Sequence, residues 1–429
     1  MPGTPPAPGT PSLLRVMNDR AALDLLLEHG PLSRTTIGRL TGLSKPTASQ
    51  LLARLESAGL VVATGTDEGR PGPSAQLYAV NARAAHVGGL DVTPQGITAA
   101  VADLTGRVVG RFELPAAAGA PAVDQVTEAL AGAVKAAGLH RDDLHRLVIA
   151  TPGAFDPQTG RLRYAGHLPG WQSPTLLDDL AAALPMPVEY ENDVNLAAVA
   201  EQRLGAARGH QDFVLLWNED GLGAALVLGG RLHRGWTGGA GEVGFLPVPG
   251  HPLVRQVERA NTGGYQELAG VQVLPRLAAE LGIAAAEQRP APGGPDAQGA
   301  PDAPGAPDAP DAPRVGHGPQ VAAAVALLER AAATPEGPYL RFLQSYATAL
   351  ATGLASLVAV LDPEIVVLSG AAVTAGGDPL RTLLEDELGE LAPSRPRLVT
   401  GEVRERPVLR GALESALAAT RDEVFDTSR

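Results

Sequence analysis

The chain has 429 residues, a formal net charge of −13 and no cysteine. Its length allows two or three domains, and its 45% hydrophobic content is enough for a large core. The absence of cysteine excludes disulfides, thiolate metal ligands and a cysteine nucleophile. Residues 1–11 are rich in Pro, Gly and Thr and are expected to form a disordered tail without a signal sequence. We recognise no apolar run of membrane-spanning length, so a cytoplasmic protein without a membrane partner is expected.

Residues 12–83 predict a small domain of helices followed by a hairpin. A first helix is expected over residues 12–30. Ser33 and Ser44 are candidate N-caps of two further helices, and Gly42 between them allows a sharp turn. Residues 61–80 read as a strand, a turn-rich loop and a returning strand. A helix-turn-helix followed by a hairpin is a winged helix.

The helix that begins at Ser44 has one apolar face and one polar, cationic face. Short polar and basic side chains at these positions can read base edges in a major groove and hold phosphates. Arg70, on the Gly/Pro-rich wing, suits a narrow minor groove. The alternatives are an ordinary helical hairpin and a solvated loop arginine. Candidate DNA-binding residues are Arg34, Ser44, Lys45, Pro46, Thr47, Ser49, Gln50, Arg54 and Arg70.

The charge is distributed unevenly along the chain. Residues 12–83 carry eight Arg or Lys and six Asp or Glu, which leaves about +2 on this segment and about −15 on the remainder. The charge alone would not indicate DNA binding. A mildly basic head can still bind DNA if the acidic body is held away from the duplex.

Residues 84–429 predict a larger domain of alternating strands and helices. This alternation indicates a mostly parallel α/β sheet with ligands at the carboxyl ends of its strands. Residues 284–318 instead repeat Pro-Asp-Ala and predict a solvated, extended insertion. Strands are expected within 86–114, 147–150, 188–190, 213–228, 231–234 and 365–370, and helices at 121–137, 176–184, 197–204, 319–333, 339–361 and 409–419.

Three segments of the body carry a family resemblance. They are Pro152-Gly153-Ala154-Phe155-Asp156-Pro157 with the following Leu168-Pro169-Gly170-Trp171, then Glu191-Asn192-Asp193-Val194-Asn195, and finally residues 230–245 with Gly239-Ala240-Gly241-Glu242. Their order and spacing resemble the ROK family of repressors, open reading frames and kinases. With the winged helix in front, the chain is similar to ROK transcriptional repressors of the xylose- or N-acetylglucosamine-responsive kind. The resemblance implies an α/β fold, with an N-terminal winged helix-turn-helix followed by a two-lobed, actin-like sugar-kinase body.

The resemblance also implies a sugar site between the lobes. Asp193 matches the general base of the kinases, and Asn192 lies beside it. A carboxylate next to an amide suits recognition of a polyhydroxyl ligand, because each group can hydrogen-bond two hydroxyls. For each carboxylate, the alternative is a surface or capping role. The implied ligand-binding residues are Asn192, Asp193, Glu242, Glu267 and His167.

The chain departs from the kinase pattern at both phosphate loops and at the zinc site. Residues 91–96 lack the glycines of the first loop, and Pro94 has no N–H to offer a phosphate. Asp220 stands in the second loop, where a carboxylate would repel ATP phosphates. Phe245 occupies the zinc-ligand histidine position, and the cysteine positions fall near Glu258, Ala260 and Tyr265. We therefore expect no catalytic residue, no metal and no cofactor.

The favoured hypothesis is a sequence-specific transcriptional regulator, in the first place a repressor of carbohydrate-utilisation genes. Its expected partners are a palindromic operator, a sugar or sugar-derivative effector, and further copies of itself in a homodimer or larger homo-oligomer. The expected location is the cytoplasm, in association with the nucleoid. One alternative is a ROK sugar kinase with a regulatory DNA-binding head. Another is a regulator whose body no longer binds a small molecule.

Overall fold

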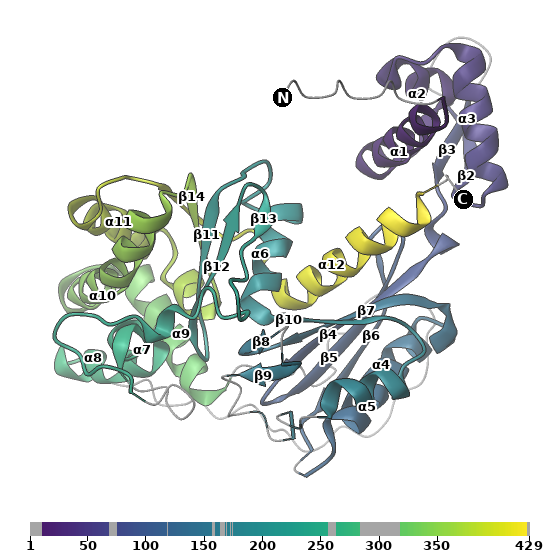
Figure 1. The fold of residues 1–429 in the computed structure, drawn as a ribbon. Helices are drawn as coiled ribbons and strands as arrows, with labels where there is room; N and C mark the ends of the chain where they lie inside the picture. The colour runs from purple at the N-terminus through teal and green to yellow at the C-terminus, as the bar shows by residue number, and fades with distance from the viewer. Residues whose placement is uncertain are drawn as a thin grey trace, which may run out of the picture.

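The computed structural model has three parts, a small head and two lobes of a larger body (Figure 1). Residues 1–10 of the expected tail, Arg70, His167 and all but the last residue of the expected insertion lie outside the part of the chain that the structure describes, whereas Pro11, also expected in the tail, begins helix α1. The described residues are 11–67, 75–117, 119–156, 159–163, 168, 170–171, 173, 175–255, 263–283 and 318–426.

The head is a helix-turn-helix with a small antiparallel sheet. Ser33 accepts a hydrogen bond from the Thr36 N–H and caps α2, while Ser44 accepts one from the Thr47 N–H and caps α3. Gly42 has a φ of 71°, so the expected turn and both expected caps are confirmed. The sheet order is β1-β3-β2. The elements are α1 (Pro11–His29), β1 (Leu32–Ser33), α2 (Arg34–Thr41), α3 (Lys45–Ser57), β2 (Val61–Asp67) and β3 (Ala75–Val80).

The first lobe is built on a five-stranded sheet of order β10-β7-β4-β5-β6. The β10, β7 and β4 strands are parallel, with Leu90 beside Ile149, whereas β5 and β6 are antiparallel additions. Helices α4 and α5 cover one face of this sheet, and α12 crosses the other (Figure 1). The elements are β4 (His86–Thr93), β5 (Gly96–Asp103), β6 (Val108–Pro115), α4 (Ala122–Ala136), β7 (Leu144–Thr151), β8 (Ala154–Asp156), β9 (Arg161–Arg163), α5 (Leu176–Ala183) and β10 (Val188–Asn192).

The second lobe repeats this plan with the sheet order β13-β12-β11-β14-β15. Here β11, β14 and β15 are parallel, and β12 and β13 are antiparallel. Each sheet is therefore mixed, which corrects the prediction of a mostly parallel sheet. The elements are β11 (Phe213–Asn218), β12 (Leu222–Leu228), β13 (Arg231–Leu232), α7 (Gly264–Ala269), α8 (Leu274–Glu280), α9 (Pro319–Ala333), α10 (Gly337–Leu361), β14 (Ile365–Ser369), α11 (Ala371–Leu391) and β15 (Arg397–Thr400).

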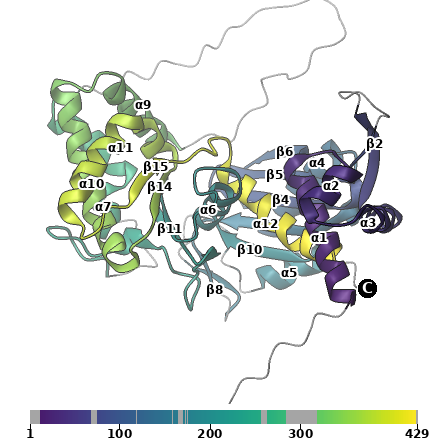
Figure 2. The ribbon, with the colours of Figure 1, turned by 90° about the horizontal axis from the view of Figure 1, so that it is seen from above.

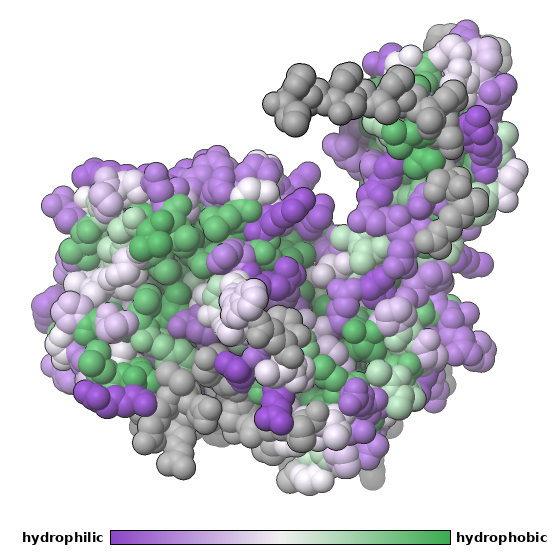
Figure 3. Space-filling model, viewed as in Figure 1, coloured by the Kyte–Doolittle hydropathy of each residue, from purple (hydrophilic) through white to green (hydrophobic). Residues whose placement is uncertain are grey.

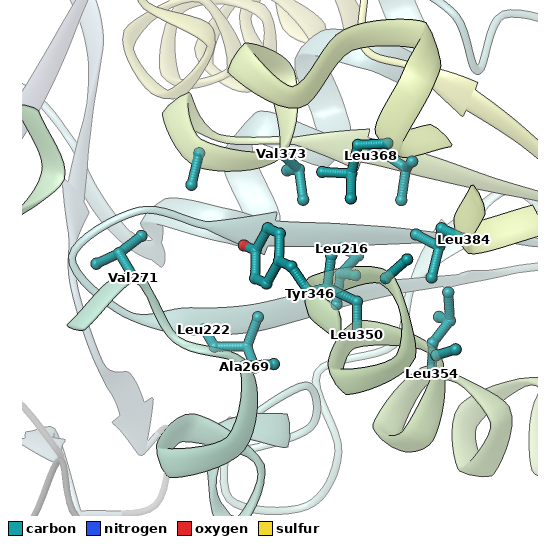
Figure 4. Packing of buried hydrophobic residues seen from close by; sticks show 14 of the residues in the cluster. Leu216, Leu222, Ala269, Val271, Tyr346, Leu350, Leu354, Leu368, Val373 and Leu384 are labelled. Atoms are coloured by element: carbon teal, nitrogen blue, oxygen red, sulfur yellow. The ribbon is translucent and has the colours of Figure 1, made fainter. Parts of the chain in front are cut away.

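Helix α10 is the long core helix of the second lobe. Its length of 25 residues and its apolar composition meet the requirements for crossing a membrane, which corrects the expectation that the chain has no such segment. The inner face of α10 is buried, and Tyr346, Leu350 and Leu354 pack among side chains from the sheet and from α11 (Figure 4). The Asn218 side-chain amide donates to the Tyr346 hydroxyl at 2.8 Å, which ties α10 to β11.

Two helices occupy the region between the lobes. Helix α6 (Asp193–Leu204) joins β10 of the first lobe to the second lobe, and α12 (Pro407–Val424) lies against it. A Cβ atom at Gly411 would lie 1.8 Å from the Leu196 carbonyl oxygen, so only glycine permits this close crossing. From there α12 runs along the first lobe and ends at the head (Figures 1 and 2).

Candidate ligand cleft and nucleic-acid interface

A cavity of about 1240 Å³ separates the two lobes. It lies where parallel strands end, because Asp91 is near the end of β4, Asn192 ends β10 and Ser369 ends β14. The cavity therefore lies at the carboxyl ends of the strands, where ligands are expected. The acidic lining residues are Asp91, Asp193, Glu219, Asp220, Glu242, Glu329 and Glu405, and the basic ones are Arg111, Arg404 and Arg406.

Asn192 and Asp193 both line the cavity, and the helix start fixes their positions. Helix α6 begins at Asp193, four residues before the expected start, because the Asn192 side chain caps it. The Asn192 amide oxygen accepts from the Asn195 N–H, and its NH2 group donates to the Gly153 carbonyl, both at 3.0 Å. One N–H and one oxygen lone pair of the Asn192 side chain, which is expected to bind a sugar, are therefore used in hydrogen bonds within the protein. One N–H and one lone pair remain for a ligand.

Three carboxyl groups at the cleft have raised pKa values. Burial raises the pKa of Asp193 to about 8, against the lowering effect of a hydrogen bond from the Val194 N–H, and nearby carboxylates add to the rise. Burial and Glu219 raise the pKa of Asp91 to about 7, and burial raises that of Glu242 to about 7. Near neutral pH these groups exist in both protonation states. They can thus donate hydrogen bonds to hydroxyl groups as well as accept them.

Glu242 is brought to the cavity by a glycine-dependent loop. Gly241 has a φ of 95°, and a Cβ atom there would lie 2.0 Å from the Ala224 carbonyl oxygen of β12. This close approach seats Glu242 at the cavity wall, one residue before a short 3-10 helix that contains Phe245. Phe245 also lines the cavity and offers an apolar ring beside the carboxyl groups.

The described lining of the cavity does not include Glu267, whose ligand-binding role stays a prediction from the family resemblance. Among the described residues that line the cavity, its neighbour Gln266 is present and Glu267 is not. The Gln266 side-chain oxygen accepts from the Leu222 N–H at 2.7 Å, so this side chain holds β12 against α7. Because α7 is a helix, adjacent residues point in different directions, and a motif match one position away does not place a side chain in the cavity.

The polar face of α3 is exposed, and its apolar face is buried as predicted. Ala48, Leu51, Leu52 and Leu55 are buried in the head core. Figure 3 shows hydrophilic residues along the outer side of the head, where α3 lies in Figure 1. Of the predicted DNA-binding residues, Ser49 is half-buried and donates to the Lys45 carbonyl oxygen. Those fully exposed are Arg34, Ser44, Lys45, Pro46, Thr47 and Gln50.

Arg54 has a different environment from the other predicted DNA-binding residues. Its guanidinium forms an ion pair with Asp19 of α1, whose side chain is 1% exposed. A buried carboxylate requires a charged or hydrogen-bonding partner, so this arginine has a structural role between α1 and α3. Its role as a phosphate contact stays a prediction, because the Arg54 side chain is also 39% exposed.

Comparison with known proteins identifies both parts of the chain. Residues 87–286 match the ROK family, and residues 18–70 match the MarR family. The chain carries a ROK body behind a MarR-like helix-turn-helix head. The solved structure of a ROK hexokinase from Thermus thermophilus is similar to this chain, with a TM-score of 0.59, 27% identity, and coverage of 79% of this chain and 99% of that one. A ROK family transcriptional regulator, a homologue of the Escherichia coli MLC protein, shares the fold over 96% of this chain and 97% of that one, with a TM-score of 0.63 and 19% identity.

Curated relatives of this chain include repressors. A putative xylose repressor of Caldicellulosiruptor sp. (strain Rt8B.4) is 26% identical over 244 residues, which cover 56% of this chain and 61% of that protein. The DNA-binding transcriptional dual regulator NagC of Escherichia coli (strain K12) is 24% identical over 265 residues, 61% of this chain and 64% of that protein. The matches thus span less than two thirds of the length of these relatives.

The side of the ROK cleft formed by β4, β5 and the loop after β11 carries the departures from the kinase pattern. Pro94 and Gln95 form the tight turn between β4 and β5, where the Thr93 hydroxyl donates to the Gly96 carbonyl oxygen at 3.1 Å. Asp220 lies on the same side, since a Cβ atom at Gly318, at the start of α9, would lie 3.3 Å from Gln95 Nε2 and 3.4 Å from Asp220 Oδ1. In the part of the chain that the structure describes, no three His, Asp or Glu side chains are arranged to hold a metal ion.

The predicted site omitted residues that the ROK body brings into the cleft. Asp91 was considered only as part of a lost phosphate loop, although its raised pKa places it with Asp193. Arg406 was not considered. It donates to the Thr98 hydroxyl at 3.0 Å, pairs with Glu113 and has a left-handed backbone with φ 48°. Arg406 belongs to no recognisable sequence motif. It reaches the cleft because the chain crosses between the lobes at this point.

Proposed function

We propose that this protein is a sequence-specific transcriptional regulator, a repressor of carbohydrate-utilisation genes that responds to a sugar or sugar derivative in the ROK cleft. The observation that carries the proposal is the exposed polar and cationic face of α3 in a MarR-like head. Curated relatives are named as repressors of xylose and N-acetylglucosamine systems, which supports the same function here. The DNA-contacting residues proposed are Arg34, Ser44, Lys45, Pro46, Thr47, Ser49, Gln50 and the wing residue Arg70.

We divide the chain at residues 83 and 84 into this DNA-binding domain and the ligand-binding body. A homodimer or larger homo-oligomer would present two heads to a palindromic operator, because two-fold symmetry in the protein matches two-fold symmetry in the DNA. The protein would act in the cytoplasm on the nucleoid.

The proposed effector is an unphosphorylated sugar or sugar derivative. Asp193, Glu242 and the free N–H of Asn192 offer both donors and acceptors to its hydroxyl groups. Asp220 on the adjacent wall opposes a phosphate group by like-charge repulsion. His167 is retained as a proposed ligand-binding residue on the family resemblance alone.

Substitution of Lys45 tests the DNA-binding proposal. Lys45→Ala should weaken binding to an operator duplex selected from a random pool and should reduce the slope of log K against log salt by about one. Lys135→Ala is a matched control, since Lys135 is the only other lysine in the chain and is exposed on α4 of the body. An isotherm and a salt slope equal to those of the wild type would show that the assigned face of α3 does not contact DNA.

We propose that the body does not transfer phosphate, although Asp193 occupies the position of the kinase base. Pro94 in the first phosphate loop and the Asp220 carboxylate in the second support this proposal. A coupled assay for ADP release over D-xylose, D-glucose and N-acetyl-D-glucosamine separates a sensor from a kinase. Sugar-dependent turnover that is lost in Asp193→Asn would establish the kinase instead. Thermal-shift measurements with the same sugars test ligand binding directly. If no sugar raises the melting temperature of protein that still binds DNA, the alternative of a body that binds no small molecule and serves for oligomerisation would be favoured.

A further inference from the structure

The last helix, α12, connects the cleft to the core of the DNA-binding head. The N-terminal end of α12 lies at the cavity, whose lining includes Arg406, Pro407 and Val408. Beyond its last turn, Phe425 is 1% exposed and packs in the same hydrophobic cluster as Leu23 and other core residues of the head. An 18-residue helix spans about 27 Å, so one rigid element reaches both places.

The segment before α12 is the chain crossing between the lobes. The Gly401 N–H donates to the Leu368 carbonyl oxygen of β14, which attaches the start of the segment to the second lobe. Five residues later the Arg406 guanidinium contacts Thr98 and Glu113 of the first lobe. A change in the angle between the lobes must therefore be absorbed in residues 401–406, at the foot of α12.

Helix α6 holds this crossing segment. Glu201 is fully buried, and its carboxylate accepts from the N–H groups of Glu402 and Val403 at 3.1 and 2.9 Å. One turn into α12, Gly411 lies against the backbone of α6 without an intervening side chain. Because α6 also begins at the cleft residue Asp193, the two helices form one packed unit with two ends in the cavity.

The other end of α12 is attached to the head by several kinds of contact. The Arg20 guanidinium of α1 lies 5.5 Å from the centre of the Phe425 ring and donates to the Asp422 carboxylate at 2.7 Å. The Arg421 guanidinium donates to the Leu104 carbonyl oxygen of the body at 3.0 and 3.1 Å. The end of α12 is thus fixed to the head and to the first lobe at their junction.

We propose that the α6–α12 pair transmits the state of the cleft to the DNA-binding head, with Phe425 as the contact that moves or steadies the head. This inference rests on the proposed function for its biological meaning, but the mechanical coupling stands on the contacts alone. A ligand that favours one angle between the lobes changes the conformation of the crossing segment. This change shifts α12, and α12 in turn shifts the position of the head relative to the body.

The test measures amide hydrogen exchange in the head of the full-length chain, so it needs neither a sugar nor DNA. Arg406→Gln removes the ion pair at the cleft end of α12, and exchange within residues 18–67 should change by about three- to tenfold. Arg111→Gln is the matched control, because Arg111 also lines the cavity but belongs to β6 and not to α12 or the crossing segment. An effect of Arg406→Gln confined to the body would overturn the proposal.

A second pair of variants tests the route through Phe425. In a Phe425→Leu background, which keeps an apolar side chain in the head core, the effect of Arg406→Gln should persist. In a Phe425→Ala background it should fall below about twofold. Persistence of the full effect in Phe425→Ala would assign the coupling to the 81–85 linker and overturn this route. Coupling in a protein that binds no operator would refute only the proposed function, and operator binding without coupling would refute only this inference.

Discussion

The raised pKa of Asp193 predicts that stability depends on pH through the cleft. In the folded protein its pKa is about 8, against an ordinary value of 3.8. Between these two values the folded state holds a proton that the unfolded state has released, so the free energy of unfolding falls as pH rises through this window. Asp193→Asn cannot release that proton. Its amide oxygen can still accept from the Val194 N–H, which preserves the start of α6.

The size of the effect is limited by water in the cavity. A shift of four pKa units would correspond to about 6 kcal/mol if the carboxyl were fully enclosed. Asp193 is only half-buried at the wall of a cleft, and it shares its titration with Asp91 and Glu242, so we expect about 1–3 kcal/mol. Asp193→Asn should therefore be more stable than the wild type by that amount at pH 8, and the difference should be smaller at pH 5, which lies nearer to the ordinary pKa of 3.8.

Guanidinium denaturation at pH 5 and pH 8, followed by tryptophan fluorescence, measures this difference. Trp217 lines the same cavity and reports on it. Asp386→Asn, which removes an exposed carboxylate of α11, should change stability by less than about 0.5 kcal/mol at both pH values. A stability difference between Asp193→Asn and the wild type that is the same at pH 5 and pH 8 would refute the assigned protonation behaviour.

Two further predictions concern packing around the head and the lobes. Arg54→Ala removes the cation beside buried Asp19 and should lower head stability by about 2 kcal/mol in thermal melts, whereas Arg39→Ala on exposed α2 should cost less than about 0.5 kcal/mol. Equal costs would refute the structural role of the Arg54–Asp19 ion pair. Gly411→Ala should lower the free energy of unfolding by about 2–4 kcal/mol in denaturant titrations, because the added Cβ meets the α6 backbone. The control Gly389→Ala, within α11, should leave stability unchanged or raise it. An unchanged stability of Gly411→Ala would disprove the close crossing.

Local signals predicted most of the elements, and they failed where distant contacts decide the structure. The caps at Ser33 and Ser44 and the strand at 365–369 follow from residue type and spacing. Helix α11 was missed because Gly377, with φ 56°, and Pro379 interrupt it, and tertiary packing continues the helix on both sides. The start of α6 was misplaced because Asn192 was read as a ligand group instead of a cap.

The candidate site divides in the same way. Asp193 and Glu242 lie in recognisable motifs, and both line the cavity. Glu267 was assigned by motif, and the direction of a helical side chain excludes it from the described lining. Phe425 lies far along the chain from Leu23 and has no local feature that would place the two in one core. Such contacts depend on topology, which periodicity does not encode.

Because Phe425 packs in the core of the head, that core cannot be completed until the end of the chain has been synthesised. The head residues leave the ribosome early, yet the ring that completes their core belongs to the far end of the chain and follows roughly 20–70 s later at ordinary rates of synthesis. A nascent chain or a truncated product would thus carry a head with an open core next to Arg20. Under the proposed function, only molecules whose body has been fully synthesised would carry a complete head for binding the operator.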